Sequence, residues 1–377
     1  MWMHGGGWTN GNGIEHDGYN GENLALHGDI VFCSLNHRLG PIGFSDFSTV
    51  GGEKYLESGN VGAMDLVAAL EWVHANIENF GGDPANVTIM GQSGGGGKVC
   101  TTSTVPAAKG LVNKAVVLSG ARLALREKEI KEKVGEYILK EAGLNASEID
   151  KLQQMPWEEY YELALTAAEK CVRDLGYTNT SARNCFQPAV DGFFIPRDPY
   201  SPEASPVAAD LPMMICSVTN ESSPTWQDSS LESMTLDDVK KKILEGGDFR
   251  GITPEKVGEI VDAYSKTFSD KNAVEIWSMI TTHRQRSVML ANTKSKQSPP
   301  VFLAWFGWQP PLFDNRLRAF HCVDICFWFY NTDVMLTHTG GGARPRALSE
   351  KMAGSLIQFM KTGDPNGGGL PEWPRYS

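Results

Sequence analysis

The pentapeptide GQSGG at residues 91–95 is the segment most suited to chemistry in this chain of 377 residues. It matches the pattern G-x-S-x-G of a nucleophile elbow, in which a sharp turn from a strand to a helix exposes a serine hydroxyl. The glycines are needed because side chains two residues before and after the serine would collide with neighbouring backbone. A β-branched segment at 87–90 precedes the motif. The sequence therefore predicts that Ser93 is a nucleophile.

A second glycine-rich segment, HGGGW at residues 4–8, matches a loop type that binds a developing oxyanion. Backbone N–H groups without neighbouring side chains can approach such a charge closely. The apolar residues 1–3 before it resemble the end of a strand. We therefore expect this segment to supply hydrogen-bond donors to a reaction at Ser93.

A serine hydroxyl needs a base to remove its proton, and a histidine base needs an acid to fix its tautomer. With a nucleophile elbow the chain order is serine, acid and histidine, which leaves His283, His321 and His338 as candidates. His283 falls in a helical pattern, and His338 lies in a polar segment next to glycines. His321 follows the last strong strand pattern, where a loop could present it to Ser93, so it is favoured.

The acid should lie in a loop that follows a strand between the serine and the histidine. Glu221 has this position because it follows the apolar segment 213–219. Asp191, which precedes a glycine in a turn, and Asp228 compete with it. Loop carboxylates are most often solvated surface groups, so the pattern alone puts Glu221 only slightly ahead.

Strand and helix patterns alternate through the first third of the chain. Apolar segments predict strands at 29–36, 87–90, 114–119, 213–219 and 300–305, and helical periodicity predicts helices at 60–79 and 348–361. This alternation is typical of an α/β fold with a mostly parallel sheet and helices on both faces. Two helical excursions, at about 126–175 and 236–292, either wall a pocket or cover the sheet. We expect one domain over residues 1–377.

Composition and charge exclude several classes of partner. The net charge of −11 and the lack of a dense basic cluster exclude nucleic acid. No apolar run approaches the roughly 18 residues that span a bilayer, and the chain as written starts with no signal peptide, so we expect it to be soluble. The seven cysteines form no CxxC pair, which argues against a metal site, although Cys171 and Cys185 could pair. The predicted chemistry needs neither a metal nor an organic cofactor.

Several longer segments resemble the type-B carboxylesterase family, which includes cholinesterases and bacterial para-nitrobenzyl esterases. Besides HGGGW, the segment NHRLGPIGF at 36–44 is similar to the family's usual N-Y-R-L-x-x-x-G-F stretch. The run 60–96, which contains the elbow, looks like the family's most recognisable signature almost throughout. Further similar segments follow in the family's order at 187–199, 217–222 and 319–329, so the resemblance covers nearly the whole chain.

This resemblance implies the α/β-hydrolase fold and hydrolysis of small-molecule carboxylic esters through an acyl-enzyme. It implies that Ser93 is the nucleophile, Glu221 the acid and His321 the base. The backbone amides of the oxyanion hole would be those of Gly6, Gly7 and Gly94. Gln92 and Gly94 stand where the family often has Glu and Ala, and neither change removes a needed amide.

Two alternatives stay open. Family members normally carry a long stretch before the oxyanion segment, where this chain begins, so it could be a non-catalytic, cholinesterase-like binding protein. A hormone-sensitive-lipase-type esterase would instead use Asp as the acid. A missing N-terminal part would also remove any signal peptide and expose a sheet edge, which leaves secretion and a homo-oligomer as expectations. The candidate walls of an apolar substrate pocket are Trp8, Phe44, Trp226, Phe327 and Trp328.

Overall fold

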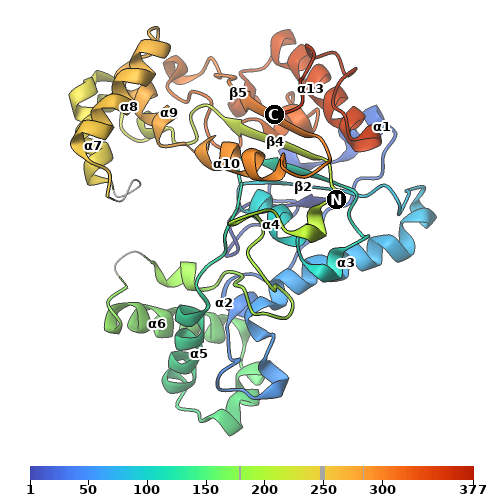
Figure 1. The fold of residues 1–377 in the computed structure, drawn as a ribbon, viewed down its shortest axis with the longest axis vertical. Coiled ribbons are helices and arrows are strands. Elements are labelled where there is room, and N and C mark those ends of the chain that lie inside the picture. Colours follow the sequence, from blue (N-terminus) through green and yellow to red (C-terminus); the bar gives the residue numbers. More distant parts are fainter. Residues whose placement is uncertain (178–179, 247–250, 283) are drawn as a thin grey trace.

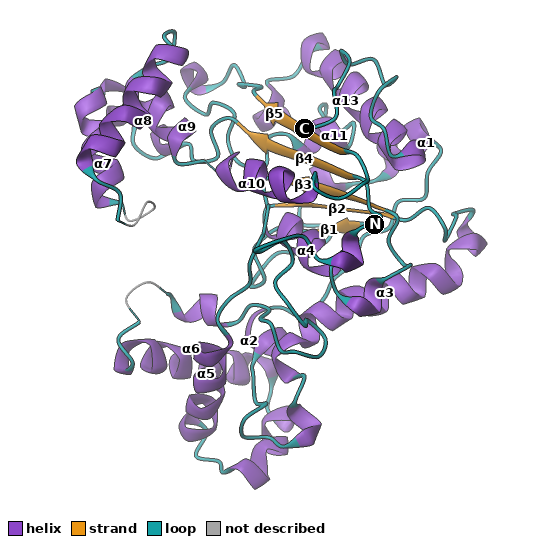
Figure 2. Ribbon diagram, in the orientation of Figure 1, coloured by secondary structure: helices purple, strands orange, loops and turns teal. Residues whose placement is uncertain are grey.

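A parallel β-sheet forms the centre of the computed structural model, which describes residues 1–377 except 178–179, 247–250 and 283 (Figure 2). In the described residues its strands are β1 (Trp2–Met3), β2 (Thr88–Gln92), β3 (Lys114–Leu118), β4 (Met213–Val218) and β5 (Val301–Phe306). They lie in sequence order, and each pairs in parallel with the next. The carboxyl ends of all these strands therefore meet at one edge of the sheet.

Helices cover both faces of this sheet, as expected for parallel strands with long apolar runs. Ile89, Val117 and Ile215 point to one face and belong to a hydrophobic cluster that includes residues of several helices. Among these helices are α3 (Val61–Asn76), α4 (Gly94–Thr102) and α10 (Arg284–Lys294). Met90 and Val116 point to the opposite face, where the cluster includes residues of α1 (Glu22–Gly28), α11 (Ile325–Trp328) and α13 (Ala343–Thr362). The predicted parallel sheet with helices on both faces is confirmed.

Most of the predicted elements lie within a few residues of the observed ones, but the strand predicted at 29–36 is wrong. This segment has no ladder pairing apart from one bridge between Ser34 and Trp2, and its first residue, Asp29, is left-handed with φ 49°. The neighbouring strand β1 is only two residues long, so it offers too few backbone groups for a ladder. The β-rich composition of the segment could not reveal this lack of a partner.

The two predicted helical blocks extend away from the sheet in different directions (Figure 1). The first contains α5 (Lys128–Glu141) and α6 (Trp157–Asp174), which pack together and against α2 (Gly40–Phe44). The second contains α7 (Leu236–Glu245), α8 (Pro254–Thr267) and α9 (Ala273–Ile280), which share a small hydrophobic cluster of their own. It ends with α10, which packs on β4 and β5 instead of projecting. A further short helix, α12 (Leu336–Thr339), precedes α13.

The described helices include none that is both long and apolar enough to cross a membrane. The assignment of the whole chain to one domain stays a prediction.

Two glycines inside helices allow the packing of the first block to be tested. A Cβ atom on Gly135 in α5 would overlap the carbonyl oxygen of Asp46, whereas a Cβ on Gly258 in α8 would meet nothing within 4 Å. We expect Gly135→Ala to lower the free energy of unfolding by about 1–3 kcal/mol, because the backbones must separate. Gly258→Ala should raise it by about 0.5–1 kcal/mol through helix propensity. Urea unfolding of both variants checks the signs, and equal signs would contradict the packing of α5.

Candidate active site

Ser93 lies in a strained turn between β2 and α4. Its backbone has φ 58° and ψ −122°, a region that side chains other than glycine rarely adopt. Its N–H donates to the carbonyl of Leu118 at 2.8 Å, which ties the turn to β3. A Cβ atom on Gly91 would overlap the backbone of Gly95, and one on Gly95 would overlap the carbonyl oxygen of Met3. The steric reason for both glycines of the elbow is therefore present in the fold.

The glycine loop that follows β1 lies directly against this turn. Gly6 and Gly7 have φ values of 79° and 67°, in the left-handed region that favours glycine. A Cβ on Gly94 would overlap the backbone of Gly7, so the loop touches the first residue of α4. In the part of the chain that the structure describes, the N–H groups of Gly6, Gly7 and Gly94 donate to no other group. These amides are available to bind an external anion.

Glu221 and His321 meet although 100 residues separate them in the sequence. Glu221 follows β4 and His321 follows β5, so neighbouring strands bring the two loops together. The carboxylate oxygen Oε2 of Glu221 lies 2.5 Å from Nδ1 of His321, and the Glu221 residue is only 8% exposed. A carboxylate only accepts hydrogen bonds, so Nδ1 carries the proton. In the neutral ring, Nε2 is then a proton acceptor.

Gln92 places this histidine beside the elbow. Its side-chain amide nitrogen lies 3.3 Å from Nε2 of His321, and its amide oxygen accepts from the thiol of Cys322 at 3.3 Å. Among the hydrogen bonds of the described residues, the hydroxyl of Ser93 takes part in none. The structure thus brings together the predicted acid and base, with the base next to residue 92, but in this conformation it forms no hydrogen bond between Ser93 and His321.

Burial and neighbouring groups shift the pKa values of His321 and of the nearby Asp324. Burial opposes a charge on the ring, but hydrogen bonding and attraction from Cys322 and Glu221 outweigh it and raise the pKa of His321 well above its ordinary value. Asp324 lies close by, fully buried, and accepts a hydrogen bond from the indole of Trp328 at 3.1 Å. Burial, followed by the neighbouring charge of Glu221, raises the pKa of Asp324 to about 6.

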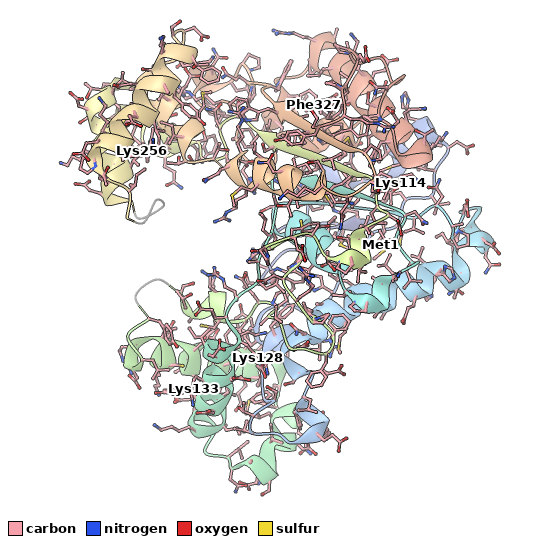
Figure 3. The ribbon with its side chains drawn as sticks, in the orientation of Figure 1. Met1, Lys114, Lys128, Lys133, Lys256 and Phe327 are labelled. Carbon is pink, nitrogen blue, oxygen red and sulfur yellow. The ribbon has the colours of Figure 1, made fainter. Side chains whose placement is uncertain are left out.

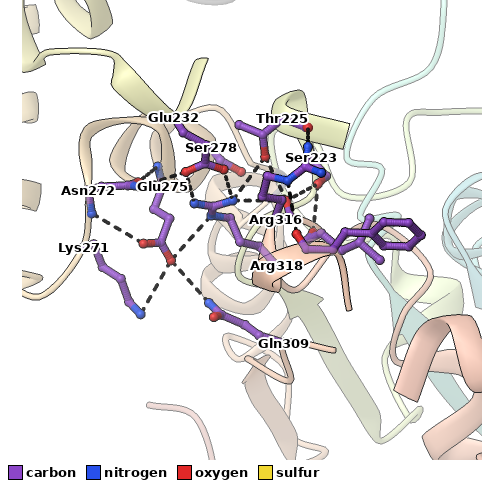
Figure 4. Close-up of polar contacts among 12 residues, drawn as sticks. Ser223, Thr225, Glu232, Lys271, Asn272, Glu275, Ser278, Gln309, Arg316 and Arg318 are labelled. Carbon is purple, nitrogen blue, oxygen red and sulfur yellow. Dashed lines mark hydrogen bonds and ion pairs between the residues drawn. The ribbon is translucent and has the colours of Figure 1, made fainter. Parts of the chain in front are cut away.

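A polar network fixes the loops that carry Glu221 and His321 (Figure 4). Ser223 donates to the carbonyl of Leu317 at 2.8 Å, which joins the two loops directly. The guanidinium of Arg318, which is 7% exposed, donates to both carboxylate oxygens of Glu232 at 2.7 Å and to the hydroxyl of Thr225 at 3.1 Å. A bidentate pair of this kind has one preferred geometry. We infer that it limits the movement of both loops.

Comparison with known proteins identifies the family. The model of the carboxylesterase family matches residues 1–377. The chain belongs to the carboxylesterase family. Para-nitrobenzyl esterase of Bacillus subtilis (strain 168) is 32% identical, with 100% of this chain and 73% of the relative covered. Phenmedipham hydrolase of Pseudarthrobacter oxydans is 27% identical, with 100% and 72% covered.

Solved carboxylesterase structures have the same fold. An esterase from Clostridium hathewayi superposes with a TM-score of 0.80 at 31% identity, with 99% of this chain and 72% of that chain covered. A carboxylesterase of Geobacillus stearothermophilus gives a TM-score of 0.79 at 31% identity, with 100% and 75% covered. These findings confirm the predicted α/β-hydrolase fold and assign the chain to the ester hydrolases.

The residues that compete with Glu221 as the acid and with His321 as the base have different hydrogen-bond partners. Asp191 accepts from the side chain of Asn60 at 2.7 Å and from two backbone N–H groups of its own turn, and Asp228 caps a short exposed helix. His338 stacks against His16, with ring centroids 6.5 Å apart, and its Nδ1 contacts a threonine hydroxyl. His283 is outside the described residues. Neither aspartate pairs with a histidine among the described residues, so an Asp acid in this carboxylesterase is not favoured.

The candidate wall residues lie mostly in the hydrophobic core. Trp8 and Phe44 are at most 1% exposed and pack edge to face with ring centroids 5.3 Å apart. Phe327 and Trp328 are buried in the cluster that contains α11 and α13, and Figure 3 places Phe327 in this C-terminal region. Trp226 differs, since it is 57% exposed. Contact of any of the five with substrate stays a prediction.

The sequence analysis missed some of the residues that surround the site. Lys98, Arg318 and Asp324 gave no signal because each lies in a segment whose pattern predicts ordinary helix or loop. The proximity of Cys322 to Gln92 also depends on the fold. All seven cysteines are free, so Cys171 and Cys185 do not pair.

Replacing Glu221 tests the assignment of the acid. In Glu221→Gln the amide no longer stabilises a charged His321 or fixes its tautomer, so we expect kcat to fall roughly 10³–10⁴-fold. With His321 assigned as the base, activity requires the neutral ring and is expected to rise as the pH passes upward through the pKa of His321. Loss of the carboxylate lowers this pKa, so the acid limb of residual activity should move to lower pH. Rates of ester hydrolysis measured across pH check both expectations.

Asp191→Asn is the matched control because it also replaces a loop carboxylate by an amide and keeps an oxygen for its backbone donors. We expect its kcat to stay within about threefold of the parent, a change below 1 kcal/mol. The assignment would be wrong if this variant lost activity while Glu221→Gln retained it.

Proposed function

We propose that this carboxylesterase cleaves esters through an acyl-enzyme formed on Ser93, with His321 as the base and Glu221 as the acid. The observation that carries the proposal is the 2.5 Å contact between Glu221 and His321 beside the strained elbow. A buried carboxylate that holds a histidine in one tautomer next to a half-buried serine is the arrangement needed to activate a hydroxyl.

In the first step the hydroxyl of Ser93 attacks the ester carbonyl, and its proton passes to Nε2 of His321. The new C–O bond produces a tetrahedral intermediate, whose oxyanion accepts hydrogen bonds from the amides of Gly6, Gly7 and Gly94. When the C–O bond to the alcohol breaks, His321 returns the proton to the leaving oxygen. Water then attacks the acyl-enzyme by the same route and releases the acid.

This mechanism requires a small rearrangement at His321. The side-chain amide of Gln92 lies next to Nε2, the atom that must accept the proton of Ser93. Reactive hydrogen bonds are often long in unliganded enzymes and shorten once substrate is bound. In the proposal, Nε2 exchanges the amide of Gln92 for the hydroxyl of Ser93 when an ester enters.

The substrates we propose are small esters with an apolar portion. Trp226 and Phe313, which are 57% and 53% exposed, form an edge-to-face pair with ring centroids 5.3 Å apart. Trp226 lies five residues after Glu221, on the loop that carries the acid. Exposed aromatic side chains beside a reactive site provide apolar surface for a ligand. Two relatives, named para-nitrobenzyl esterase and phenmedipham hydrolase, are compatible with aromatic groups in the substrate.

A series of p-nitrophenyl esters from acetate to long acyl chains tests the proposed reaction. We expect a burst of p-nitrophenol equal to the enzyme concentration, followed by slower turnover, because the acyl-enzyme accumulates. Ser93→Ala should abolish the burst and lower kcat by about 10⁶-fold, as loss of a nucleophile does elsewhere. The dependence of kcat/KM on chain length ranks the acyl groups.

Ser103→Ala is a matched control because Ser103 lies in the same region but is buried and bonds to Tyr200. Its burst should be unchanged. A burst that survives in folded Ser93→Ala would overturn the assignment of the nucleophile.

A further inference from the structure

Lys98 is a buried cation next to the site. It lies in α4, five residues after Ser93, and its side chain is fully buried. In the part of the chain that the structure describes, it forms no ion pair with a carboxylate. Removing an ammonium group from water without a counter-charge costs several kcal/mol, so its polar contacts must compensate.

Among the described residues, the hydrogen bonds and the cation–π contact of Lys98 involve the glycine loop and its flanking residues. Its ammonium donates to the carbonyl of His4 at 2.8 Å and, more weakly, to that of Gly5 at 3.4 Å. It also lies 5.8 Å from the ring centre of Trp8, at the other end of the loop. One side chain from α4 therefore contacts the residues on both sides of Gly6 and Gly7, namely His4 and Gly5 before them and Trp8 after them.

The peptide group converts these contacts into a constraint on the N–H groups. Each peptide unit is planar and trans, so the C=O of one residue and the N–H of the next point in opposite directions. The hydrogen bond to the carbonyl of Gly5 fixes the direction of the N–H of Gly6. The hydrogen bond to the carbonyl of His4 fixes the preceding peptide unit, which contains the N–H of Gly5. Glycines offer little resistance to rotation, so this loop needs an external restraint.

Two histidines near Lys98, His4 and His37, are uncharged near pH 7 and therefore do not repel its ammonium group. His4 and His37 stack with ring centroids 5.4 Å apart. Burial, together with the charge of Lys98, lowers the pKa of His4 to about 4 and that of His37 to about 3, so both rings are neutral near pH 7. Burial likewise lowers the pKa of Lys98 to about 7, and the charge of Glu15 acts in the opposite direction.

Burial alone does not distinguish Lys98 from other lysines. Lys131 is also fully buried and donates to the carbonyl of Gly59 at 2.8 Å, and Lys294 donates to that of Ala208 at 2.9 Å. Those carbonyls belong to segments that contribute none of the proposed catalytic groups. What distinguishes Lys98 is that its acceptors belong to the loop whose amides face the elbow.

We propose that Lys98 is a positioning residue, which holds the carbonyls of His4 and Gly5 so that the amide of Gly6 points to the oxyanion. This inference rests on the proposed function, since it assigns that amide to the oxyanion hole. Lys98 itself does not touch the substrate. Its contribution therefore lies in stabilising the transition state and not in binding the ground state.

The test compares Lys98→Met with Lys131→Met. Each replaces a buried ammonium by an uncharged chain of similar length, so both lose a hydrogen bond to a carbonyl. Loss of one oxyanion donor lowers kcat by about 10²–10³-fold in known enzymes, and loss of its orientation should lower kcat at least about tenfold. We expect this decrease in Lys98→Met with KM nearly unchanged, and an unchanged kcat in Lys131→Met. The affinity for a trifluoromethyl ketone, which forms the oxyanion, should fall by the same factor as kcat.

Lys98→Gln provides a second measurement that does not depend on the methionine variant being stable. Its amide retains a donor of shorter reach, so we expect a kcat between those of the parent and Lys98→Met, whereas a purely structural role predicts no such recovery at equal melting temperature. If Lys98→Met does not fold, kcat of Lys98→Gln is compared with that of Lys131→Gln. The proposal is overturned if folded Lys98→Met keeps kcat and ketone affinity within about twofold of Lys131→Met or, where Lys98→Met does not fold, if Lys98→Gln keeps them within about twofold of Lys131→Gln.

The burst amplitude separates this proposal from the proposed function. Lys98→Met should still release one p-nitrophenol per enzyme, only more slowly, because Ser93 is intact. A burst retained in Ser93→Ala would refute the nucleophile, whereas a normal burst rate in Lys98→Met would refute only the role of Lys98.

Discussion

The close approach of the first turn of α4 to the loop after β1 is the constraint on which the site depends. Side chains at Gly94 or Gly95 would overlap the backbone of Gly7 or Met3 in this contact. The same contact holds Ser93 in an unfavourable backbone conformation, which the rest of the fold must stabilise. The buried strands β2 and β3 do this, because the N–H of Ser93 bonds to the end of β3. The position of the proposed nucleophile and of the amides proposed to bind the oxyanion thus depends on one packing contact.

The parallel sheet brings the other groups to the same edge. Loops after β1, β2, β4 and β5 carry the glycine segment, Ser93, Glu221 and His321 in turn. The acid and the base follow adjacent strands, so their contact needs only short loops. Open sheets of this kind bind ligands outside the carboxyl ends of their strands. The network around Arg318 then reduces the freedom of the two loops, which is the condition for a short contact between Glu221 and His321.

Buried charges surround this edge although charged residues are rare in protein interiors. Lys98 is satisfied by carbonyls of the glycine loop, and Arg318 by Glu232. Asp324 lies within the influence of Glu221 and His321, and burial favours its protonated form. Lys98 and Arg318 contact segments that carry proposed functional residues, and Asp324 lies three residues after His321. Stability alone would favour apolar side chains in such places, and the arrangement is consistent with polar groups that fix the loops of the site.

The sequence by itself determined the parts that depend on local spacing. The glycine pattern predicted the elbow at Ser93 and the loop at residues 4–8, since both follow from steric limits within a few residues. Apolar runs likewise predicted β2 to β5. Spacing alone left Glu221 only slightly ahead of Asp191, and the family resemblance was needed to separate them.

Only the tertiary structure decided which distant segments meet. The contact of Glu221 with His321 spans 100 residues, and that of Lys98 with His4 spans 94. The segment 29–36 formed no strand because the neighbouring strand β1 is only two residues long. Four of the aromatic residues predicted to line the pocket lie in the hydrophobic core, namely Trp8, Phe44, Phe327 and Trp328. Each outcome depends on the packing partner and not on the segment itself, which is why local patterns could not predict it.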